Sequence, residues 1–158
     1  MNALTNKLLG NTVRIREAKH DDLFAMTALL TELFNIEVDF TPNLSNQREG
    51  LAALMSSEES TLLVADVKGK IIGMCTLQSL ISTAEGGLVG IIEDLVIAQD
   101  HRGQGIGMKL LETIEKIAKD KGMLRLQLLT DVHEKTEAFF SQGQWKPTQL
   151  VVKRKLLK

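Results

Sequence analysis

The chain has 158 residues, 44% of them hydrophobic and 25% charged, and its formal net charge at pH 7 is −1. This length fits one globular domain, and the balanced charge gives no electrostatic reason to bind nucleic acid. No apolar run reaches the roughly 18 residues of a membrane span, and a lone cysteine fits a reducing compartment. We therefore expect a cytoplasmic protein with one domain over residues 12–158, preceded by a flexible segment over residues 1–11.

The hydrophobic pattern predicts strands and helices in alternation along the chain. Apolar residues recur at every second position in the predicted strands and at every third or fourth position in the predicted helices. The predicted strands are 12–18, 61–67, 70–82, 88–98, 123–130 and 145–157. The predicted helices are 20–34, 46–57, 106–121 and 133–142. This order favours a mixed α/β sheet, in which a central strand–turn–helix–strand unit is flanked by antiparallel strands.

A glycine-rich turn connects the apolar strand 88–98 to the helix that follows it. The first N–H groups of a helix have no partner inside the helix, and the helix dipole makes that end partly positive. Glycines let the backbone approach a ligand closely, and an arginine adds a cation. The turn is therefore predicted to bind a pyrophosphate, and a turn that binds no ligand is the alternative. Its residues are Arg102, Gly103, Gln104, Gly105, Ile106 and Gly107.

Two other phosphate-binding motifs fit this turn less well. The nucleoside-triphosphate loop, Gly-x4-Gly-Lys-Ser/Thr, does not occur in the sequence. A dinucleotide fingerprint that starts at Gly103 has Met108 in place of its third glycine, although Asp131 lies roughly where a ribose-binding acid would. No second parallel half follows the turn. A dinucleotide-dependent enzyme is therefore a weaker alternative.

The string IEDLVIAQDHRGQGIGMKLLE resembles the core motif of the GNAT N-acetyltransferase superfamily, with Arg102, Gly105 and Gly107 at the motif positions. The order of elements from about residue 12 to residue 157 is also similar. The resemblance implies a mostly antiparallel sheet with splayed central strands and about four flanking helices. It implies acetyl-CoA as cosubstrate, no metal, an amine acceptor, and often a homodimer. The pantetheine arm would pair with the backbone of Leu95, Val96 and Ile97.

Acetyl transfer to an amine needs a neutral nitrogen, so a general base is useful. Glu93 is the candidate base, because a carboxylate inside an apolar strand is costly unless it is partnered or functional, and burial would raise its pKa. A period of two places Glu93 on one face with Leu95 and Ile97, and Asp94, on the other face, is the second candidate. An ion-paired acid without a catalytic role is the alternative.

The resemblance extends to the helix 133–142, where the family pattern Asn-x-x-Ala-x-x-Phe-Tyr falls on His133, Thr136, Phe139 and Phe140. The first three are expected to contact the coenzyme. The family's tyrosine, a general acid, is replaced by Phe140, and the chain has no tyrosine. Water, His133 or the proton of the substrate amine would then serve the leaving thiolate. The same departure supports a non-catalytic acyl-CoA-binding or regulatory domain as the alternative function.

Glu37 and Asp39 lie in the predicted loop 34–45, which in the family borders the acceptor site. Two acids there would hold a cationic amine, and a solvated loop is the alternative. Cys75, in an apolar strand, is predicted to be a buried, inert thiol rather than an acetyl carrier. The predicted function is direct acetyl transfer from acetyl-CoA to a primary amine of a small molecule or peptide, within a ternary complex.

Overall fold

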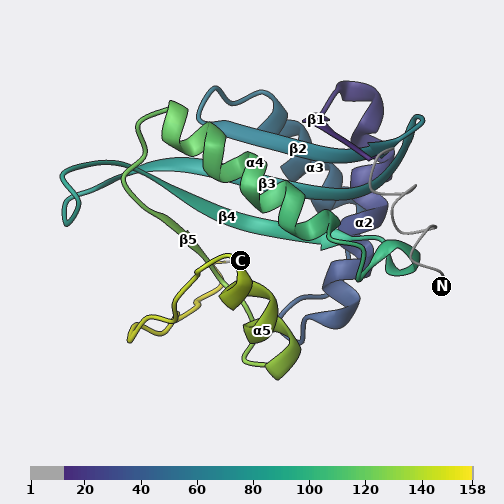
Figure 1. The fold of residues 1–158 in the computed structure, drawn as a ribbon. Coiled ribbons are helices and arrows are strands. Elements are labelled where there is room, and N and C mark those ends of the chain that lie inside the picture. The colour runs from purple at the N-terminus through teal and green to yellow at the C-terminus, as the bar shows by residue number, and fades with distance from the viewer. Residues whose placement is uncertain (1–12, 158) are drawn as a thin grey trace.

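The computed structural model describes residues 13–157, so the predicted flexible segment 1–11 lies outside the described residues. Its central sheet has the strand order β1-β2-β3-β4-β5 (Figure 1). Neighbouring strands from β1 to β4 are antiparallel, and β5 is parallel to β4. The predicted mixed, mostly antiparallel sheet is confirmed. The strands are β1 (Arg14–Glu17), β2 (Ser60–Val67), β3 (Lys70–Ser82), β4 (Gly87–Ile97) and β5 (Leu126–Leu128).

Four α-helices flank the sheet in the described chain, as predicted. They are α2 (Leu23–Ile36), α3 (Leu44–Met55), α4 (Ile106–Asp120) and α5 (Glu134–Gln142). Two short 3-10 turns, η1 (His20–Asp22) and η2 (Gln99–His101), precede α2 and the glycine turn. Helix α4 crosses one face of the sheet, and α2 and α3 cover the other (Figure 1). None of the helices within residues 13–157 is long and apolar enough to cross a membrane.

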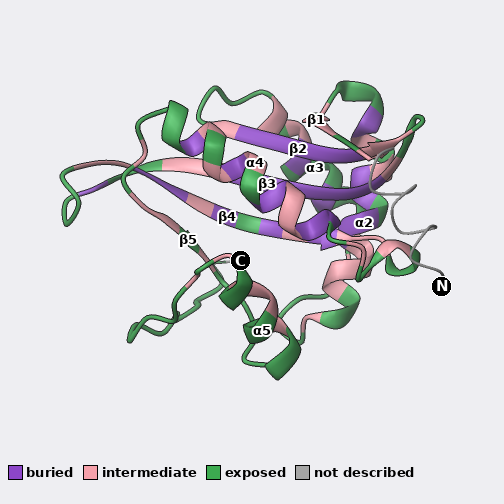
Figure 2. Ribbon diagram, viewed as in Figure 1, coloured by how far each residue is buried: buried purple, intermediate pink, exposed green. Residues whose placement is uncertain are grey.

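The core consists of two apolar layers, one on each face of the sheet. Strand β2 shows why: Leu63 packs with Leu110 of α4 in one layer, whereas Leu62 packs with Met26 of α2 in the other. Because both faces are covered, β2, β3 and β4 can be apolar almost throughout. Figure 2 shows the buried stretches along these three strands, in contrast to the largely exposed α5 and C-terminal segment.

Strands β4 and β5 separate after a short pairing. Their register covers only Gly90–Ile92 of β4 opposite Leu126–Leu128 of β5. Beyond Ile92, β4 remains paired with β3 but has no β5 partner, and the two strands diverge in Figure 1. The predicted splay is confirmed, and it leaves one edge of residues 93–97 open.

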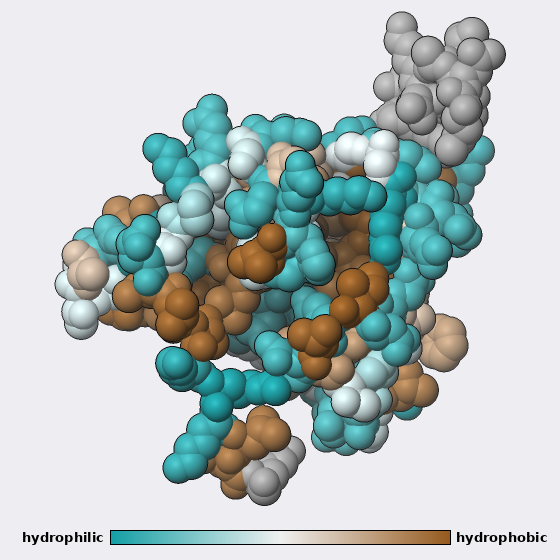
Figure 3. Space-filling model, turned by 90° about the horizontal axis from the view of Figure 1, so that it is seen from below, coloured by the Kyte–Doolittle hydropathy of each residue, from teal (hydrophilic) through white to brown (hydrophobic). Residues whose placement is uncertain are grey.

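The C-terminal part departs from the sequence prediction. The strand expected at 123–130 is reduced to the three residues of β5, with Leu129 62% exposed. The strand expected at 145–157 does not form in the described chain, and these residues pair with no strand of the sheet. Figure 3, seen from below, shows its end standing away from the rest of the surface. The exposed apolar residues of this segment are Leu150, Val151, Val152, Leu156 and Leu157.

Candidate active site

The glycine turn adopts a backbone shape that requires glycine at two positions. Gly103 has φ +71° and Gly105, the N-cap of α4, has φ +77°, both in the left-handed region that side chains with a Cβ rarely adopt. Within the described chain, no backbone carbonyl accepts the N–H groups of residues 103–107. These N–H groups at a helix start therefore fit an anion such as pyrophosphate.

Arg102 and Glu32 fix the turn against β4 and α2. The Arg102 Nε donates to the carbonyl of Ile97 at 2.8 Å, and its Nη2 lies 3.6 Å from Glu32 Oε2. The same carboxylate accepts the N–H of Gln99 at 3.1 Å. Arg102 therefore stabilises the turn through these contacts and also places a positive charge beside it.

Gly107 lies where α4 packs closely against α5. A Cβ at this position would lie 3.1 Å from the ring of Phe139. The contact of Gly107 with the turn's ligand stays a prediction, and the packing of Phe139 beside it is a second reason for a residue without a Cβ at this position. Phe139 packs against the core layer under α4, Thr136 is half-buried, and His133 is exposed at the N-cap of α5.

A β-bulge in β4 determines where its two acids point. Cys75 is paired with Leu95, whereas Leu77 is paired with Ile92, so Glu93 and Asp94 together oppose the single residue between them on β3. A bulge breaks the regular alternation of a strand. Both acids consequently line one cavity, while Leu95 and Ile97 pack toward α4. The predicted sharing of a face by residues 93, 95 and 97 is wrong.

Asp94 is the buried acid of the pair, and Glu93 is exposed. Asp94 is only 7% exposed. The Thr76 hydroxyl donates to its Oδ2 at 2.9 Å and accepts its backbone N–H at 3.0 Å. Burial raises the pKa of Asp94 to about 6, since it outweighs the Thr76 hydrogen bond, and the charge of Glu93 adds to the rise. The burial expected for Glu93 belongs instead to its neighbour.

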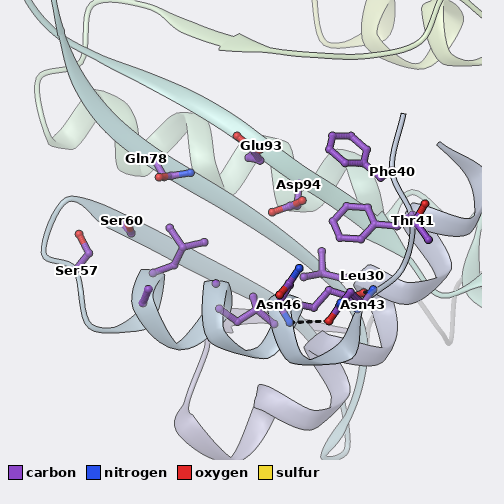
Figure 4. Close-up of a pocket in the computed structure, with 16 residues that line it drawn as sticks. Leu30, Phe40, Thr41, Asn43, Asn46, Ser57, Ser60, Gln78, Glu93 and Asp94 are labelled. Carbon is purple, nitrogen blue, oxygen red and sulfur yellow. Dashed lines mark hydrogen bonds between the residues drawn. The ribbon is translucent and has the colours of Figure 1, made fainter. Parts of the chain in front are cut away.

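A cavity of about 610 Å³ lies between α3, the sheet and the loop that joins α2 to α3. In Figure 4 the carboxylate of Asp94 lies between the sheet and α3, with Phe40 and Thr41 on the side of the loop. Asn43 caps α3 by accepting the N–H of Asn46 at 3.0 Å. The polar lining residues are Thr41, Asn43, Asn46, Gln47, Ser57, Ser60, Gln78, Glu93 and Asp94.

The loop acids lie close enough to affect the acids of the bulge. Glu37, at the end of α2, has a raised pKa, first because of burial and then because of the charges of Asp94, Asp131, Glu93 and Asp39. Asp39 is exposed. The structure thus brings the predicted acceptor-site acids to the same region as the predicted base.

Cys75 fits its predicted inert role. It is fully buried in β3, and burial raises the pKa of its thiol to about 12. A thiol that stays protonated at neutral pH is a poor nucleophile, which argues against covalent transfer through this residue.

Residues 26–143 match the family model described as the acetyltransferase (GNAT) family. The chain belongs to this family. Its general activity is therefore acetyl transfer, and the fold and the glycine turn predicted from the family motif agree with this membership. Membership also favours a coenzyme A ligand over the dinucleotide alternative.

Two curated relatives are named as N-acetyltransferases. The chain is 29% identical over 118 residues to an aminoalkylphosphonate N-acetyltransferase of Salmonella typhimurium, covering 75% of this chain and 74% of the relative. It is 31% identical over 126 residues to a thialysine N-epsilon-acetyltransferase of Bos taurus, covering 73% of each.

Solved structures give the same fold. A transcriptional regulator from Bacillus halodurans C-125 superposes with a TM-score of 0.79 at 25% identity, covering 91% of this chain and 99% of that one. An aminoglycoside acetyltransferase from an uncultured soil metagenomic sample superposes with a TM-score of 0.76 at 22% identity, covering 95% and 99%. At this identity the second likeness supports the fold alone.

Sequence reasoning missed the importance of Asp94, Thr76 and Glu32. The adjacent acids in the apolar string IIEDLVI were the available signal for Asp94, which was predicted only as the second candidate. The alternation rule placed Asp94 on the correct face and failed for Glu93, because it does not foresee a bulge. Thr76 and Glu32 act through contacts with residues 18 and 67 positions away along the chain. No local pattern in the sequence points to such partners.

Proposed function

We propose that this protein is an N-acetyltransferase that transfers the acetyl group of acetyl-CoA directly to a primary amine of a small molecule or peptide in a ternary complex. The observation that carries the proposal is the arrangement along β4. Its open edge leads to the glycine turn, and its bulge places Asp94 against the cavity. One strand thus connects the proposed donor site and the proposed acceptor site.

The donor would bind along the open edge of β4 and at the start of α4. The N–H of Ala98 donates to Ile72 of β3, so the two-residue period turns the N–H groups of Leu95 and Ile97 toward the open edge. The N–H of Val96 points to β3 by the same rule. We therefore assign the pantetheine contacts to Leu95 and Ile97, and the pyrophosphate to the N–H groups of residues 103–107.

Asp94 is the stronger candidate for the base. Its pKa of about 6 leaves it ionised at neutral pH, while it remains basic enough to take a proton from an ammonium directly or through water. The neutral nitrogen then attacks the thioester carbonyl, a C–N bond forms, the C–S bond breaks, and the nitrogen gives up its second proton to the leaving thiolate or to water. A free thiol has a pKa of about 8.5 in solution, so the thiolate can leave without help from a general acid. The absence of a tyrosine at position 140 is therefore compatible with transfer. Glu93, at the exposed side of the bulge, is kept as the second candidate.

Binding of acetyl-CoA tests the donor site. Gly105→Glu is expected to weaken binding at least tenfold in calorimetry, because it strains a left-handed position and places a carboxylate where the pyrophosphate would lie. Gly86→Glu is the matched control, since Gly86 has φ +74° and open space around it in the β3–β4 turn. Equal affinities of the two variants would contradict the assignment.

Thiol release with a panel of primary amines tests the transfer step. Asp94→Asn is expected to lower kcat/KM by about 10²- to 10⁴-fold, the range for loss of a general base. Glu93→Gln is the comparison, and the larger loss identifies the base. Acetyl-CoA binding without transfer to any amine would support the non-catalytic alternative. The cytoplasmic location and the homodimer remain predictions.

A further inference from the structure

We propose that the acceptor carries a second positive charge besides its reacting amine, and that Asp39, Glu37 and the ring of Phe40 bind this second cation at the rim of the cavity. This inference rests on the proposed function, because it concerns the same acceptor site. The substrate class it names is a flexible diamine or polyamine, with an apolar chain between its cationic groups.

The charged residues that line the cavity are all acidic. Glu93 and Asp94 line the cavity, and no lysine, arginine or histidine of the described chain is among the lining residues. Glu37 interacts electrostatically with both of these acids and with Asp39 and Asp131. An acceptor with one ammonium group would compensate only part of this charge, whereas an anionic group would be repelled.

A cation of the chain itself is already seated at this rim. The Arg154 Nη1 donates to the carbonyl of Asp39 at 2.7 Å, and Nη2 lies 3.9 Å from Asp39 Oδ1. The guanidinium carbon is 5.4 Å from the centroid of the Phe40 ring, which itself lines the cavity. A carboxylate, a carbonyl and an aromatic face together form a recognition site for a cation.

Arg154 is well placed to be displaced by a substrate. Its side chain is 47% exposed and belongs to the C-terminal segment, which forms no strand in the described chain. Exposed ion pairs of this kind contribute little free energy, so an acceptor cation can replace it. We infer that Arg154 occupies the subsite when no acceptor is bound.

The rest of the cavity suits a hydrocarbon chain. Leu30, Phe34, Leu51 and Leu54 from α2 and α3 form its apolar side. Methylene groups between two cationic ends would contact these side chains, while the ends reach Asp94 and the rim. The aminoalkylphosphonate named for the Salmonella typhimurium relative differs in having an anion at one end.

The experiment compares three acceptors of similar length: 1,5-diaminopentane, pentan-1-amine and 3-aminopropylphosphonate. The expected kcat/KM for the diamine exceeds that of the monoamine by about 10- to 100-fold, the combined effect of an ion pair and a cation–π contact. The phosphonate is expected to be the poorest. In the double variant Glu37→Gln/Asp39→Asn, the ratio of kcat/KM for the diamine to kcat/KM for the monoamine should fall below about 3, because both rim carboxylates are removed.

The control variant Glu112→Gln/Asp120→Asn removes the same two charges from exposed positions of α4 and should keep the full ratio. Rising ionic strength in the wild-type protein provides a measurement that needs no variant to fold. It should lower kcat/KM for the diamine more than for the monoamine, because salt screens the rim acids.

The outcomes separate this inference from the proposed function. Acetyl transfer with equal kcat/KM for the diamine and the monoamine, or with a preference for the phosphonate, overturns the cation subsite and leaves the transferase function standing. If no amine is acetylated, the affinities of the diamine and the monoamine are compared by calorimetry. Tighter binding of the diamine that is lost in Glu37→Gln/Asp39→Asn supports the subsite while the transfer function fails. No preference in binding overturns the subsite as well.

Discussion

The two sides of β4 differ in how completely they are paired. On one side, β3 follows β4 from Gly87 to Ile97 with a single irregularity, and residues 72–77 of β3 are buried on both faces. On the other side, β5 pairs over three residues and then departs, and the chain beyond it is mostly exposed. The closed side provides a rigid support, and the open side leaves backbone groups free for a ligand.

Asp94 lies where these two regions meet. The bulge that turns it toward the cavity is held by Thr76 of β3, a strand that pairs with β2 on one side and β4 on the other. A strained or buried acid is retained only where the surrounding structure fixes it. The closed half therefore positions the group that we assign to chemistry, while the open half is expected to receive the donor.

Core truncation should give the largest contrast between the two regions. Leu110→Ala removes a fully buried side chain between α4 and the sheet and should lower the free energy of unfolding by about 2–5 kcal/mol. Leu129→Ala, at a position 62% exposed just after β5, should change it by less than about 0.5 kcal/mol. Denaturant titration measures both, and similar losses would show that the open side is as tightly packed as the core.

The ion pairs of Arg16 give a smaller effect on the closed side. Arg16 pairs with Asp22 at 2.7 Å and with Asp66 at 2.9 Å. Its hydrogen bonds lower the pKa of both acids and outweigh burial, which acts in the opposite direction. Arg16→Gln should cost about 1–3 kcal/mol of unfolding free energy at pH 7. The exposed pair of Arg125 with Glu85 is the control, and Arg125→Gln should cost at most about 1 kcal/mol.

The ion pairs of Arg16 also predict how the stability of the protein changes at low pH. Because the pKa of Asp22 is lower in the folded protein than its ordinary value of about 3.9, the stabilisation is complete at neutral pH and is lost as pH falls below about 4. Arg16→Gln should show a flatter decline in stability there. A decline as steep as that of the wild-type protein would mean that other acids dominate.

The pH profile of acetyl transfer tests the role of Asp94 as the base. With a pKa of about 6, Asp94 loses its basic form as pH falls, so kcat/KM should drop about tenfold per pH unit below 6. Asp94→Asn should lack this acid limb in its residual activity. An acid limb that persists in Asp94→Asn but disappears in Glu93→Gln would transfer the role of base to Glu93.

Arg154→Gln should have the smallest effect. It frees the rim cation site at Asp39 and Phe40, and KM for 1,5-diaminopentane should fall by about 2- to 5-fold, corresponding to the free energy of one exposed ion pair. KM for pentan-1-amine is the internal reference. A rise in the KM of the diamine would instead assign Arg154 to substrate binding.

The elements whose partners are near in sequence were predicted well. The hairpin of β2 and β3, the long apolar β4 and the amphipathic α4 follow from periodicity and turn residues, with bounds close to those expected. The glycine turn was also located correctly, because left-handed positions at Gly103 and Gly105 demand a residue without a Cβ. For these parts, local sterics and hydrophobic spacing were sufficient.

The expected final strand shows the limit of that reasoning. WKPTQLVVKRKLL has the apolar character of a strand, but a strand forms only by pairing with another strand, and in the described chain this segment does not pair with β5 at the end of the sheet. Local preference therefore indicated a strand that the sheet does not contain.

By itself, the sequence determined the fold class, the glycine turn and the presence of two acids inside an apolar strand. Only the tertiary structure decided which acid is buried, because the choice depends on a bulge set by the pairing of β4 with Thr76 of β3. It also decided that Arg154 meets Asp39, 115 positions away along the chain. Spacing rules describe neighbours along one element, whereas burial and charge environment are set by residues that folding brings together.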